Sequence, residues 1–388
     1  MWLTLLFCFT TALFLWMTSS ALFHLQWAQR LPRLSDRDKA LGAGESRDAP
    51  VLCSVVIAAR DEEARIENTI RNLLVQREVN LEIIAVDDRS TDRTEEILTR
   101  LTQQDDRVRM QRVHTLPDGW LGKCYACHIG AAIAKGHWIL FTDADCWMKP
   151  DVIARALRVA NRDRVDHVTL TPGIAEGSVG AQAWHLAFLI SLADWLSGVN
   201  RDRPKAYFGI GAFNLVQASA YRQCGGYESL RLTVLDDVRL GLLLHRVGKR
   251  TRAFLGGDDV VCHWGTTVRD LVKIHEKNYF AAVNFRLSVA LMAGLGGMIF
   301  WCVAIVGLVT GMAAGLVTGL AMFSLCIPAY ILSRRIGWRG PSWLVAPLVF
   351  PMLFYALLRS AFVTIRRGGV SWRDTFYSLD ELRRSSVR

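Results

Sequence analysis

Long apolar runs at both ends of this 388-residue chain constrain its fold more than any other feature of the sequence. Residues 1–25 are almost wholly apolar, and further runs cover 287–310, 316–333 and 342–363. Helices of about 20 apolar residues are long enough to cross a bilayer. Residues 51–265 instead mix charged, glycine and aliphatic residues, as globular proteins do. The sequence therefore predicts an anchor at 1–25, a linker at 26–50, a globular domain at 51–265 and membrane helices within 287–365.

The charges next to the first run predict its orientation. The basic residues that follow it are Arg30, Arg33, Arg37 and Lys39. Basic residues beside membrane helices stay in the cytoplasm, so we expect an outside N-terminus and a cytoplasmic domain. The alternative is a cleaved signal peptide, cut near Ser19 or Ala21, but the charged n-region is missing and the run is longer than an h-region. We therefore expect a multi-pass protein of the inner (plasma) membrane.

Basic residues on both sides of the last apolar run conflict with a single crossing. They are Arg334, Arg335 and Arg339 before it, and Arg366, Arg367 and Arg373 after it. All can be cytoplasmic only if the run returns to the side from which it entered. Pro347 and Pro351 interrupt the run, so we expect a re-entrant hairpin followed by a cytoplasmic tail at 366–388.

Residues 266–286 carry apolar side chains at helical spacing. Because they precede a membrane segment, we expect an amphipathic helix in the membrane surface, although a core helix of the domain fits the pattern equally well.

The formal net charge of +10 does not indicate a nucleic-acid partner. Many of the basic residues flank the apolar runs, and the sequence has no basic stripe with interleaved aromatic residues. The nine cysteines lack framework spacing, and Cys124 and Cys127 form a lone C-x-x-C whose expected role is helix packing rather than zinc binding.

From residue 53 the pattern changes to short β-branched runs separated by amphipathic helices. It predicts strands at 53–59, 81–88 and 137–145, and helices at 66–76 and 94–104. This alternation predicts an α/β fold with a doubly wound, mostly parallel sheet. Ligands of such sheets bind beyond the carboxyl ends of the strands.

Acidic pairs stand at two of these strand ends. Asp87 and Asp88 close the second strand and precede a turn into a helix, which suits hydrogen bonds to a nucleoside; the alternative is a helix cap from Asp88, Ser90 or Asp92. Asp143 and Asp145 project to one face and can converge on Mg²⁺ or Mn²⁺, which would hold a diphosphate. Isolated D-x-D pairs are otherwise usually exposed turn residues.

Two further residues extend this expected site. Lys123 opens a helix after glycines and can neutralise phosphates, with a solvated surface lysine as the alternative. His263 follows a β-branched run and can complete the metal shell, with a structural histidine as the alternative.

A third acidic pair opens a later amphipathic helix. One of Asp236 and Asp237 can cap the first turn while the other faces a cleft as a general base. Sugar transfer with inversion needs a single carboxylate to deprotonate the acceptor hydroxyl, and no covalent nucleophile.

Taken in order, these segments resemble glycosyltransferase family 2 across roughly residues 53–265. SVVIAARDEEARI resembles the first strand of the family, AVDDRSTD its nucleoside-binding turn, FTDAD its metal-binding D-x-D, and GAFNLVQASAYRQCGGYE its acceptor-side segment. TVLDDVRLG resembles the T-x-x-E-D motif, with Asp236 in place of the glutamate and Asp237 in the position of the base. The resemblance implies a GT-A fold, an inverting mechanism, and a UDP- or GDP-sugar donor bound with Mg²⁺ or Mn²⁺. The residues that it places at the donor are Ala59, Arg60, Glu62, Asp87, Asp88, Lys123 and Asp143, with Asp143, Asp145 and His263 as metal ligands.

The membrane runs and the GWLGKCYA segment look most like members that glycosylate lipids, including hopene- and carotenoid-associated glycosyltransferases and, more distantly, ceramide glucosyltransferases. The Q-x-x-R-W signature of processive synthases is absent after Asp237, where the chain reads HEKNYF, which favours single transfer. The expected acceptor is a membrane lipid hydroxyl. The alternatives are a polyprenyl phosphate acceptor, which needs no strong base, or a catalytically silent membrane scaffold that retains the fold.

Overall fold

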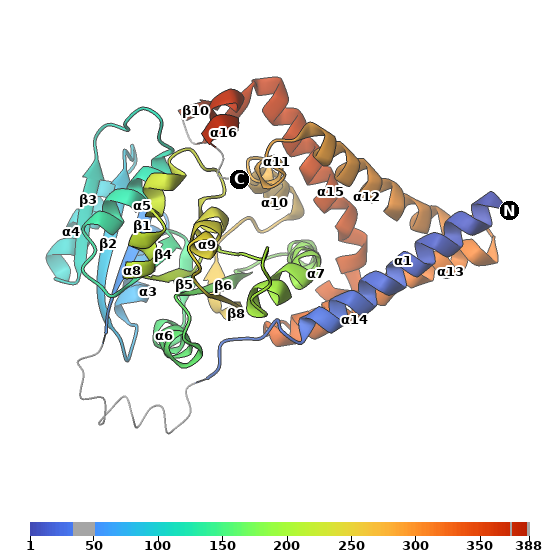
Figure 1. Ribbon diagram of the computed structural model, residues 1–388, viewed down its shortest axis with the longest axis horizontal. Helices are drawn as coiled ribbons and strands as arrows, with labels where there is room; N and C mark the ends of the chain where they lie inside the picture. Colours follow the sequence, from blue (N-terminus) through green and yellow to red (C-terminus); the bar gives the residue numbers. More distant parts are fainter. Residues whose placement is uncertain (34–50, 373–374, 386–388) are drawn as a thin grey trace.

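The computed structural model describes residues 1–33, 51–372 and 375–385. It combines an α/β domain with a set of apolar helices from the two ends of the chain (Figure 1). Most of the expected linker, residues 34–50, lies outside the described residues.

The domain is built on an eight-stranded sheet in the order β3-β2-β1-β4-β7-β6-β8-β5. Its strands are β1 (Leu52–Ala59), β2 (Asn80–Asp88), β3 (Val108–Val113), β4 (Trp138–Asp143), β5 (Cys146–Met148), β6 (His167–Ile174), β7 (Asn214–Gln217) and β8 (Thr251–Cys262). The pairs β1·β2, β1·β4, β2·β3 and β6·β8 are parallel, whereas β7 is antiparallel to both neighbours and β5 to β8. The expected mostly parallel α/β sheet is confirmed, and the three expected strands correspond to β1, β2 and β4.

Helices cover both faces of this sheet. They are α3 (Ile66–Leu74), α4 (Thr94–Gln104), α5 (Gly122–Ala132), α6 (Val152–Asp163), α8 (Ala218–Gln223), the 3-10 helix η1 (Gly226–Leu230) and α9 (Asp236–Arg246). Because successive strand residues point to opposite faces, Val55 and Ile57 of β1 pack with α3, α4 and α6, while Val56 packs with α5 and α9.

A long apolar helix that the sequence reading did not predict, α7 (Val179–Asn200), joins the domain to the apolar helices. Its buried residues include Trp184, Leu186 and Leu189, which share one core with Phe14 and Phe350 from the two ends of the chain. Most of α7 is buried, which explains its apolar composition, whereas Ser191, Asp194 and Trp195 are exposed.

The apolar helices are α1 (Trp2–Leu25), α12 (Leu287–Gly307), α13 (Ala313–Met322), the 3-10 helix η2 (Phe323–Leu325), α14 (Cys326–Arg335) and α15 (Ser342–Arg367). Four stretches are long and apolar enough to cross a membrane: Trp2–Leu25, Leu287–Gly307, Ala313–Arg335 and Ser342–Arg367. The ring of Phe14 in α1 lies 4.4 Å from that of Phe300 and 5.2 Å from that of Trp301, centroid to centroid. The first helix is thus part of the bundle core.

The prediction of a re-entrant hairpin in the last apolar run is wrong, because α15 is one continuous helix with Pro347 and Pro351 inside it. Pro351 has no N–H, so the carbonyl of Pro347 lacks its usual helical donor. The indole N–H of Trp301 in α12 donates to that carbonyl at 2.8 Å. A neighbouring helix therefore satisfies the group that the proline leaves free, and the helix need not break.

Both ends of α15 nevertheless contact the same side of the molecule. Just before α15, the ring of Trp338 lies 5.5 Å from that of His185 in α7. Near its other end, Arg359 and Arg367 pair with Glu276 at 3.1 and 3.4 Å. Figure 1 shows α15 running beside the domain, while α1, α12 and α13 extend away from it. Basic residues at both ends of α15 are therefore compatible with one continuous helix whose two ends lie on the domain side.

The segments on either side of α12 and α15 also differ from expectation. Residues 266–286 form two short helices, α10 (Val268–His275) and α11 (Tyr279–Ala282), rather than one amphipathic helix. Residues after α15 form a hairpin, β9 (Gly369–Trp372) and β10 (Thr375–Ser378), and a final helix, α16 (Leu379–Ser385). This part of the expected tail packs on the domain, because Val370, Tyr377 and Leu382 share a core with α5.

The two ends of α15 should face the same aqueous compartment as the domain. In a chain whose exposed Cys8 and Cys302 are replaced by serine, we expect Arg339→Cys and Arg366→Cys to react with a membrane-impermeant maleimide from the same side as Gln103→Cys in α4. Labelling of right-side-out and inside-out vesicles measures this. Reaction of the two ends from opposite sides would show that α15 crosses the membrane.

Candidate active site

A cavity of about 830 Å³ opens where β1, β2 and β4 end. Of the residues expected at the site, those that line it are Ala59, Arg60, Glu62, Asp88, Lys123, Asp143, Asp145, Asp236, Asp237 and His263. Asp87 is not among the lining residues. Segments from residue 59 to residue 263 therefore meet at the strand-end edge, as ligand sites of α/β sheets do.

Hydrogen bonds join the loop after β1 to the loop after β2. Asp61 Oδ1 accepts a hydrogen bond from the Thr91 N–H at 2.8 Å, and the Thr94 hydroxyl accepts one from the Glu62 N–H at 2.8 Å. Asp61 and Arg89 adopt left-handed backbone (φ 52° and 59°), which costs roughly 1 kcal/mol or more for each residue. The contacts between the loops hold this strained backbone and fix Glu62 at the cavity.

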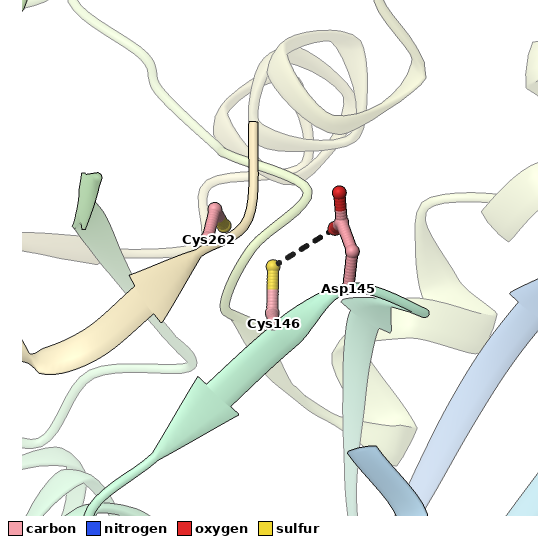
Figure 2. Close-up of side chains that lie close together, drawn as sticks. All are labelled: Asp145, Cys146 and Cys262. Atoms are coloured by element: carbon pink, nitrogen blue, oxygen red, sulfur yellow. Dashed lines mark hydrogen bonds between the residues drawn. The ribbon is translucent and has the colours of Figure 1, made fainter. Parts of the chain in front are cut away.

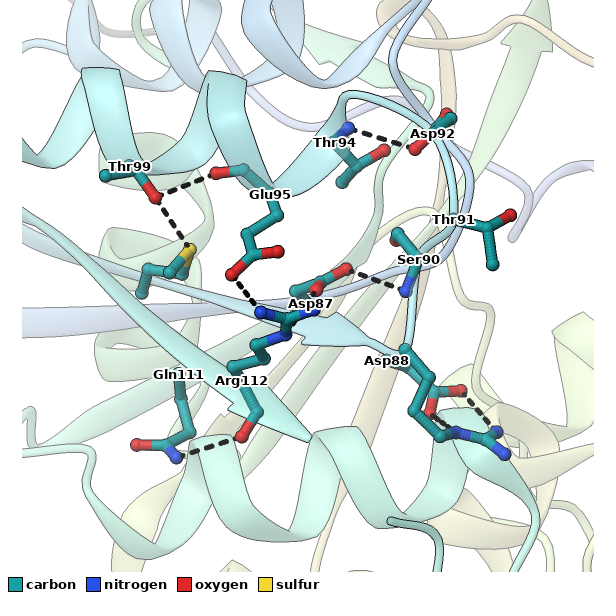
Figure 3. Close-up of polar contacts among 12 residues, drawn as sticks. Asp87, Asp88, Ser90, Thr91, Asp92, Thr94, Glu95, Thr99, Gln111 and Arg112 are labelled. Atoms are coloured by element: carbon teal, nitrogen blue, oxygen red, sulfur yellow. Dashed lines mark hydrogen bonds and ion pairs between the residues drawn. The ribbon is translucent and has the colours of Figure 1, made fainter. Parts of the chain in front are cut away.

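The two aspartates that end β2, Asp87 and Asp88, have different surroundings (Figure 3). Asp88 lines the cavity, and Arg89 donates to its carboxylate at 2.8 and 3.3 Å. Asp87 is fully buried: its Oδ1 accepts from the Ser90 N–H at 3.2 Å, and its Oδ2 lies 3.8 Å from Arg112 Nε. Burial raises the pKa of Asp87. The contacts of Asp87 therefore support the turn, and of the two residues only Asp88 lines the cavity.

The N-cap residue of α4 is Arg93, which makes no side-chain cap hydrogen bond. Just before it, Asp92 Oδ1 accepts a hydrogen bond from the Thr94 N–H at 2.9 Å. Asp88 does not cap the helix and is thus left available to the cavity.

Lys123 lies among carboxylates in the first turn of α5. Its ammonium is 2.6 Å from Asp143 Oδ1 and 3.9 Å from Asp236 Oδ1. Burial by itself lowers the pKa of Lys123, but Asp143, Asp236 and Asp237 together raise it well above the usual value. Lys123 therefore stays charged inside the cavity and is not a solvated surface lysine.

The two aspartates at the start of α9 differ in their partners. Asp236 is buried, and its Oδ2 accepts a hydrogen bond from the Tyr227 hydroxyl at 2.9 Å. Asp237 accepts from the N–H groups of Gly211 at 2.6 Å and Val238 at 2.8 Å. Burial, followed by the charge of Asp236, raises the pKa of Asp237 to about 6. Asp237 is therefore a carboxylate of increased basicity that lines the cavity.

Asp145 and His263 provide further groups that suit a divalent cation. Burial, followed by the charge of Asp143, raises the pKa of Asp145, and Arg65 at 4.0 Å opposes the shift. His263 Nδ1 lies 3.1 Å from the carbonyl oxygen of Asp145. A ring N–H that donates there leaves Nε2 with a lone pair. Carboxylate oxygens suit Mg²⁺ or Mn²⁺ by their chemistry. In the part of the chain that the structure describes, ligand atoms of Asp143, Asp145 and His263 do not all lie within 4.8 Å of one another, so the structure does not bring the expected metal ligands together as one set.

Two thiols beside Asp145 do not suit an ion (Figure 2). Within the described ranges, Asp145, Cys146 and Cys262 are the only three such groups whose ligand atoms lie within 4.8 Å of one another. Burial raises the pKa of Cys262 to about 11 and that of Cys146 well above its usual value. Thiolates suit soft metals, whereas Mg²⁺ and Mn²⁺ prefer oxygen ligands, so these buried thiols are not expected to hold such an ion. Cys124 and Cys127 likewise lie in the core beneath α5, as expected.

The sequence reading missed several residues that line the cavity. Gly211 approaches so closely that a Cβ there would lie 2.7 Å from Asp143 Oδ2 and 3.1 Å from Lys123 Nζ. The G-I-G at 209–211 before β7 was an available signal for a close backbone approach. One wall is apolar and comes from Phe188, Leu192 and Trp195 of α7. An uninterrupted apolar run at 186–190 was the signal for this helix.

Comparisons with known proteins agree with this arrangement. Residues 54–225 match the family model described as Glycosyl transferase family 2. The chain is 28% identical over 198 residues to a beta-monoglucosyldiacylglycerol synthase of Nostoc sp. (strain PCC 7120), which covers 50% of this chain and 41% of that protein. It is 36% identical over 92 residues to a 4,4'-diaponeurosporenoate glycosyltransferase of Staphylococcus haemolyticus, 24% of each chain. The chain therefore spans less than half the length of these curated relatives.

A solved structure shares the fold over almost the whole chain. The mannosyltransferase PcManGT from Pyrobaculum calidifontis, in complex with GDP-Man and Mn²⁺, superposes with a TM-score of 0.56 and 14% identity, covering 94% of this chain and 99% of that one. The sheet, the strand-end cavity and this likeness define a GT-A glycosyltransferase fold. Residues 54–225, less than half of the chain, are similar to glycosyl transferase family 2, as the motifs suggested.

The close approach at Gly211 predicts that a single methyl group disturbs the charged cluster. We expect Gly211→Ala to lower the free energy of unfolding by about 1–3 kcal/mol, because the methyl group collides with Asp143 and presses on Lys123. Thermal unfolding of the full chain in detergent measures the change. Gly296→Ala in α12, where a Cβ meets nothing within 4 Å, is the matched control. Equal unfolding midpoints for the two variants would contradict this account.

Proposed function

We propose that the chain is an inverting glycosyltransferase that moves a sugar from a nucleotide-diphosphate sugar, of UDP or GDP type, to a hydroxyl group of a membrane lipid. One observation carries the proposal: Asp88, Lys123, Asp145 and Asp237 line the same cavity, and the apolar helix α7 forms another wall of it. A nucleotide sugar needs the charged wall, and a lipid needs the apolar one.

The donor occupies the charged wall in this proposal. Asp88 at the end of β2 accepts hydrogen bonds from the nucleoside. Lys123 lies at the start of α5, where the ammonium and the helix N-terminus both favour phosphate. A Mg²⁺ or Mn²⁺ ion held by Asp143, Asp145 and His263 would supply positive charge for the diphosphate. The complex of PcManGT with GDP-Man and Mn²⁺ supports the same assignment.

Transfer proceeds in one displacement. Asp237 takes the proton of the acceptor hydroxyl while its oxygen bonds to the anomeric carbon. The bond from that carbon to the phosphate oxygen breaks, and the nucleoside diphosphate leaves with the electron pair. Attack opposite the leaving group inverts the anomeric centre. Asp236, held by Tyr227, is a positioning residue whose charge raises the pKa of Asp237.

The acceptor reaches Asp237 along the apolar wall. Phe188, Leu192 and Trp195 lie on α7, the helix that packs against α1 and α15. The relatives named for diacylglycerol and for diaponeurosporenoate act on lipids by their names, which supports a lipid acceptor here. In this proposal the domain faces the cytoplasm, and α1 and α12–α14 anchor it in the inner membrane.

The proposed base has a pH signature. Asp237 accepts a proton only when ionised, and its pKa is raised to about 6, so kcat/KM should fall about tenfold per pH unit below that value and stay level above it. An unperturbed carboxyl group would keep the rate level down to about pH 4. Asp236→Asn removes the neighbouring charge, so the fall should move to lower pH. A profile that is level to pH 4.5 would exclude Asp237 as the base.

The proposed reaction predicts a labelled lipid. Membranes containing the protein are incubated with a panel of labelled UDP- and GDP-sugars, and the extracted lipids are identified. We expect Asp237→Ala and Asp145→Ala to lower labelling by a factor of about 10² or more, with Asp118→Ala, exposed and outside the cavity, as the control. Full labelling in either variant would remove that residue from the mechanism.

The alternatives give different results in the same assay. Near-normal transfer by Asp237→Asn would indicate a polyprenyl phosphate acceptor, which needs no strong base. Absence of labelled lipid, together with absence of metal-dependent UDP or GDP binding by calorimetry, would indicate a silent scaffold.

A further inference from the structure

The chain returns from α15 to the domain through the hairpin β9–β10. Gly368 ends α15 in left-handed backbone (φ 70°) and redirects the chain. Val370 pairs with Tyr377 across the hairpin, and Trp372 lies two residues further along β9, so these three side chains share one face. Val370 and Tyr377 are 5% and 7% exposed, whereas Phe376 on the opposite face is 54% exposed. The hairpin therefore has a defined inner face.

The helix that follows anchors this hairpin. Ser378 and Glu381 cap the start of α16 through a hydrogen bond of 2.6 Å between their side chains. Leu382 is buried in the core that also holds α5 and α9, and the Arg383 guanidinium donates to the Phe285 carbonyl at 3.1 Å. The hairpin is thus held against the domain by its inner face and by the helix α16 that follows it.

The inner face of the hairpin forms part of the cavity wall. Trp372 and Tyr377 line the same cavity as Asp88 and Lys123. The Tyr377 hydroxyl lies beside the backbone amide of Gly122, the first residue of α5, within the electrostatic influence of Asp88.

Trp372 meets a cation at the same wall. The ammonium of Lys277, from the turn between α10 and α11, lies 3.7 Å from the centroid of the Trp372 ring. Lys277 also lines the cavity. An indole ring attracts and orients such an ammonium. Trp372 therefore holds the positive charge of Lys277 at the cavity wall.

We propose that Trp372 and Tyr377 complete the binding site for the nucleotide-diphosphate part of the donor. This inference rests on the proposed function and adds that the donor site is incomplete without residues that follow the last apolar helix. Tyr377 abuts the start of α5, where the backbone amides and Lys123 favour phosphate. Trp372 holds Lys277 at the wall as a second ammonium for the diphosphate.

The test measures nucleotide binding by the full chain. The protein is reconstituted in nanodiscs with Mn²⁺, and the Kd of UDP and of GDP is measured by calorimetry for the wild type, Trp372→Ala, Tyr377→Phe and Phe376→Ala. For the nucleotide that the wild type binds, we expect Trp372→Ala to raise Kd about tenfold and Tyr377→Phe to raise it by a factor of about 3. Phe376→Ala, on the outer face, should leave Kd unchanged. In transfer assays, the inner-face variants should raise the KM of the donor and leave the KM of the acceptor unchanged.

The outcomes separate this inference from the proposed function. Inner-face variants that unfold at the wild-type temperature and bind nucleotide as the wild type does would overturn the inference alone. A wild type that binds neither UDP nor GDP would overturn both. If Trp372→Ala does not fold, Tyr377→Phe and Lys277→Gln decide, since both keep the core intact; unchanged Kd in these two would overturn the inference.

Discussion

A lysine ammonium held among carboxylates fixes the geometry of the cavity. Lys123 comes from α5, Asp143 from β4, and Asp236 and Asp237 from α9, so the cluster requires these three elements to have one relative arrangement. Backbone amides and the Tyr227 hydroxyl satisfy the carboxylate oxygens that Lys123 does not reach. Buried charges are tolerated only with such partners.

The same cluster is short of positive charge, and this shortage has chemical consequences. Several carboxylates raise the pKa of Lys123 against the effect of burial, whereas burial, followed by the charge of Asp236, raises the pKa of Asp237. A divalent cation at Asp143 and Asp145 would relieve the repulsion between these two groups. The excess of negative charge therefore contributes both to the basicity of Asp237 and to the attraction for a cation.

Much of the sheet and of the charged wall could be predicted because both follow local rules. Period-two and period-3.6 patterns located β1, β2, β4, α3 and α4, and strand ends located Asp88, Asp143 and Asp145. The assignment of Asp87 to the donor neglected the same alternation, since adjacent strand residues point to opposite faces and only Asp88 lines the cavity. The apolar helix α7 had a local signal, an apolar run within the globular segment, that went unused.

Other features had no local signal because they depend on contacts between distant segments. The continuity of α15 depends on Trp301, whose indole satisfies the carbonyl that Pro351 leaves free; proline alone argued for a break. The hairpin after α15 joins the domain only because α15 runs beside α7 and delivers Gly368 to the domain surface. Its sequence shows no pattern that predicts a place in the cavity wall.

The residues that line the cavity come from two parts of the chain, one inside the segment that matches the family model and one after it. The segment that matches the family, residues 54–225, supplies Asp88, Lys123, Asp143 and Asp145. Asp237, His263, Lys277 and Trp372 follow that segment, on α9, β8 and the parts next to the apolar helices. Similarity over the matched segment thus bears on the charged wall of the cavity that holds Asp88, Lys123, Asp143 and Asp145, whereas Asp237 and the segments nearest the bundle lie outside the matched segment. Acceptor specificity next to Asp237 would therefore depend on these later segments and on α7. It would also depend on how the apolar helices pack these segments against the sheet.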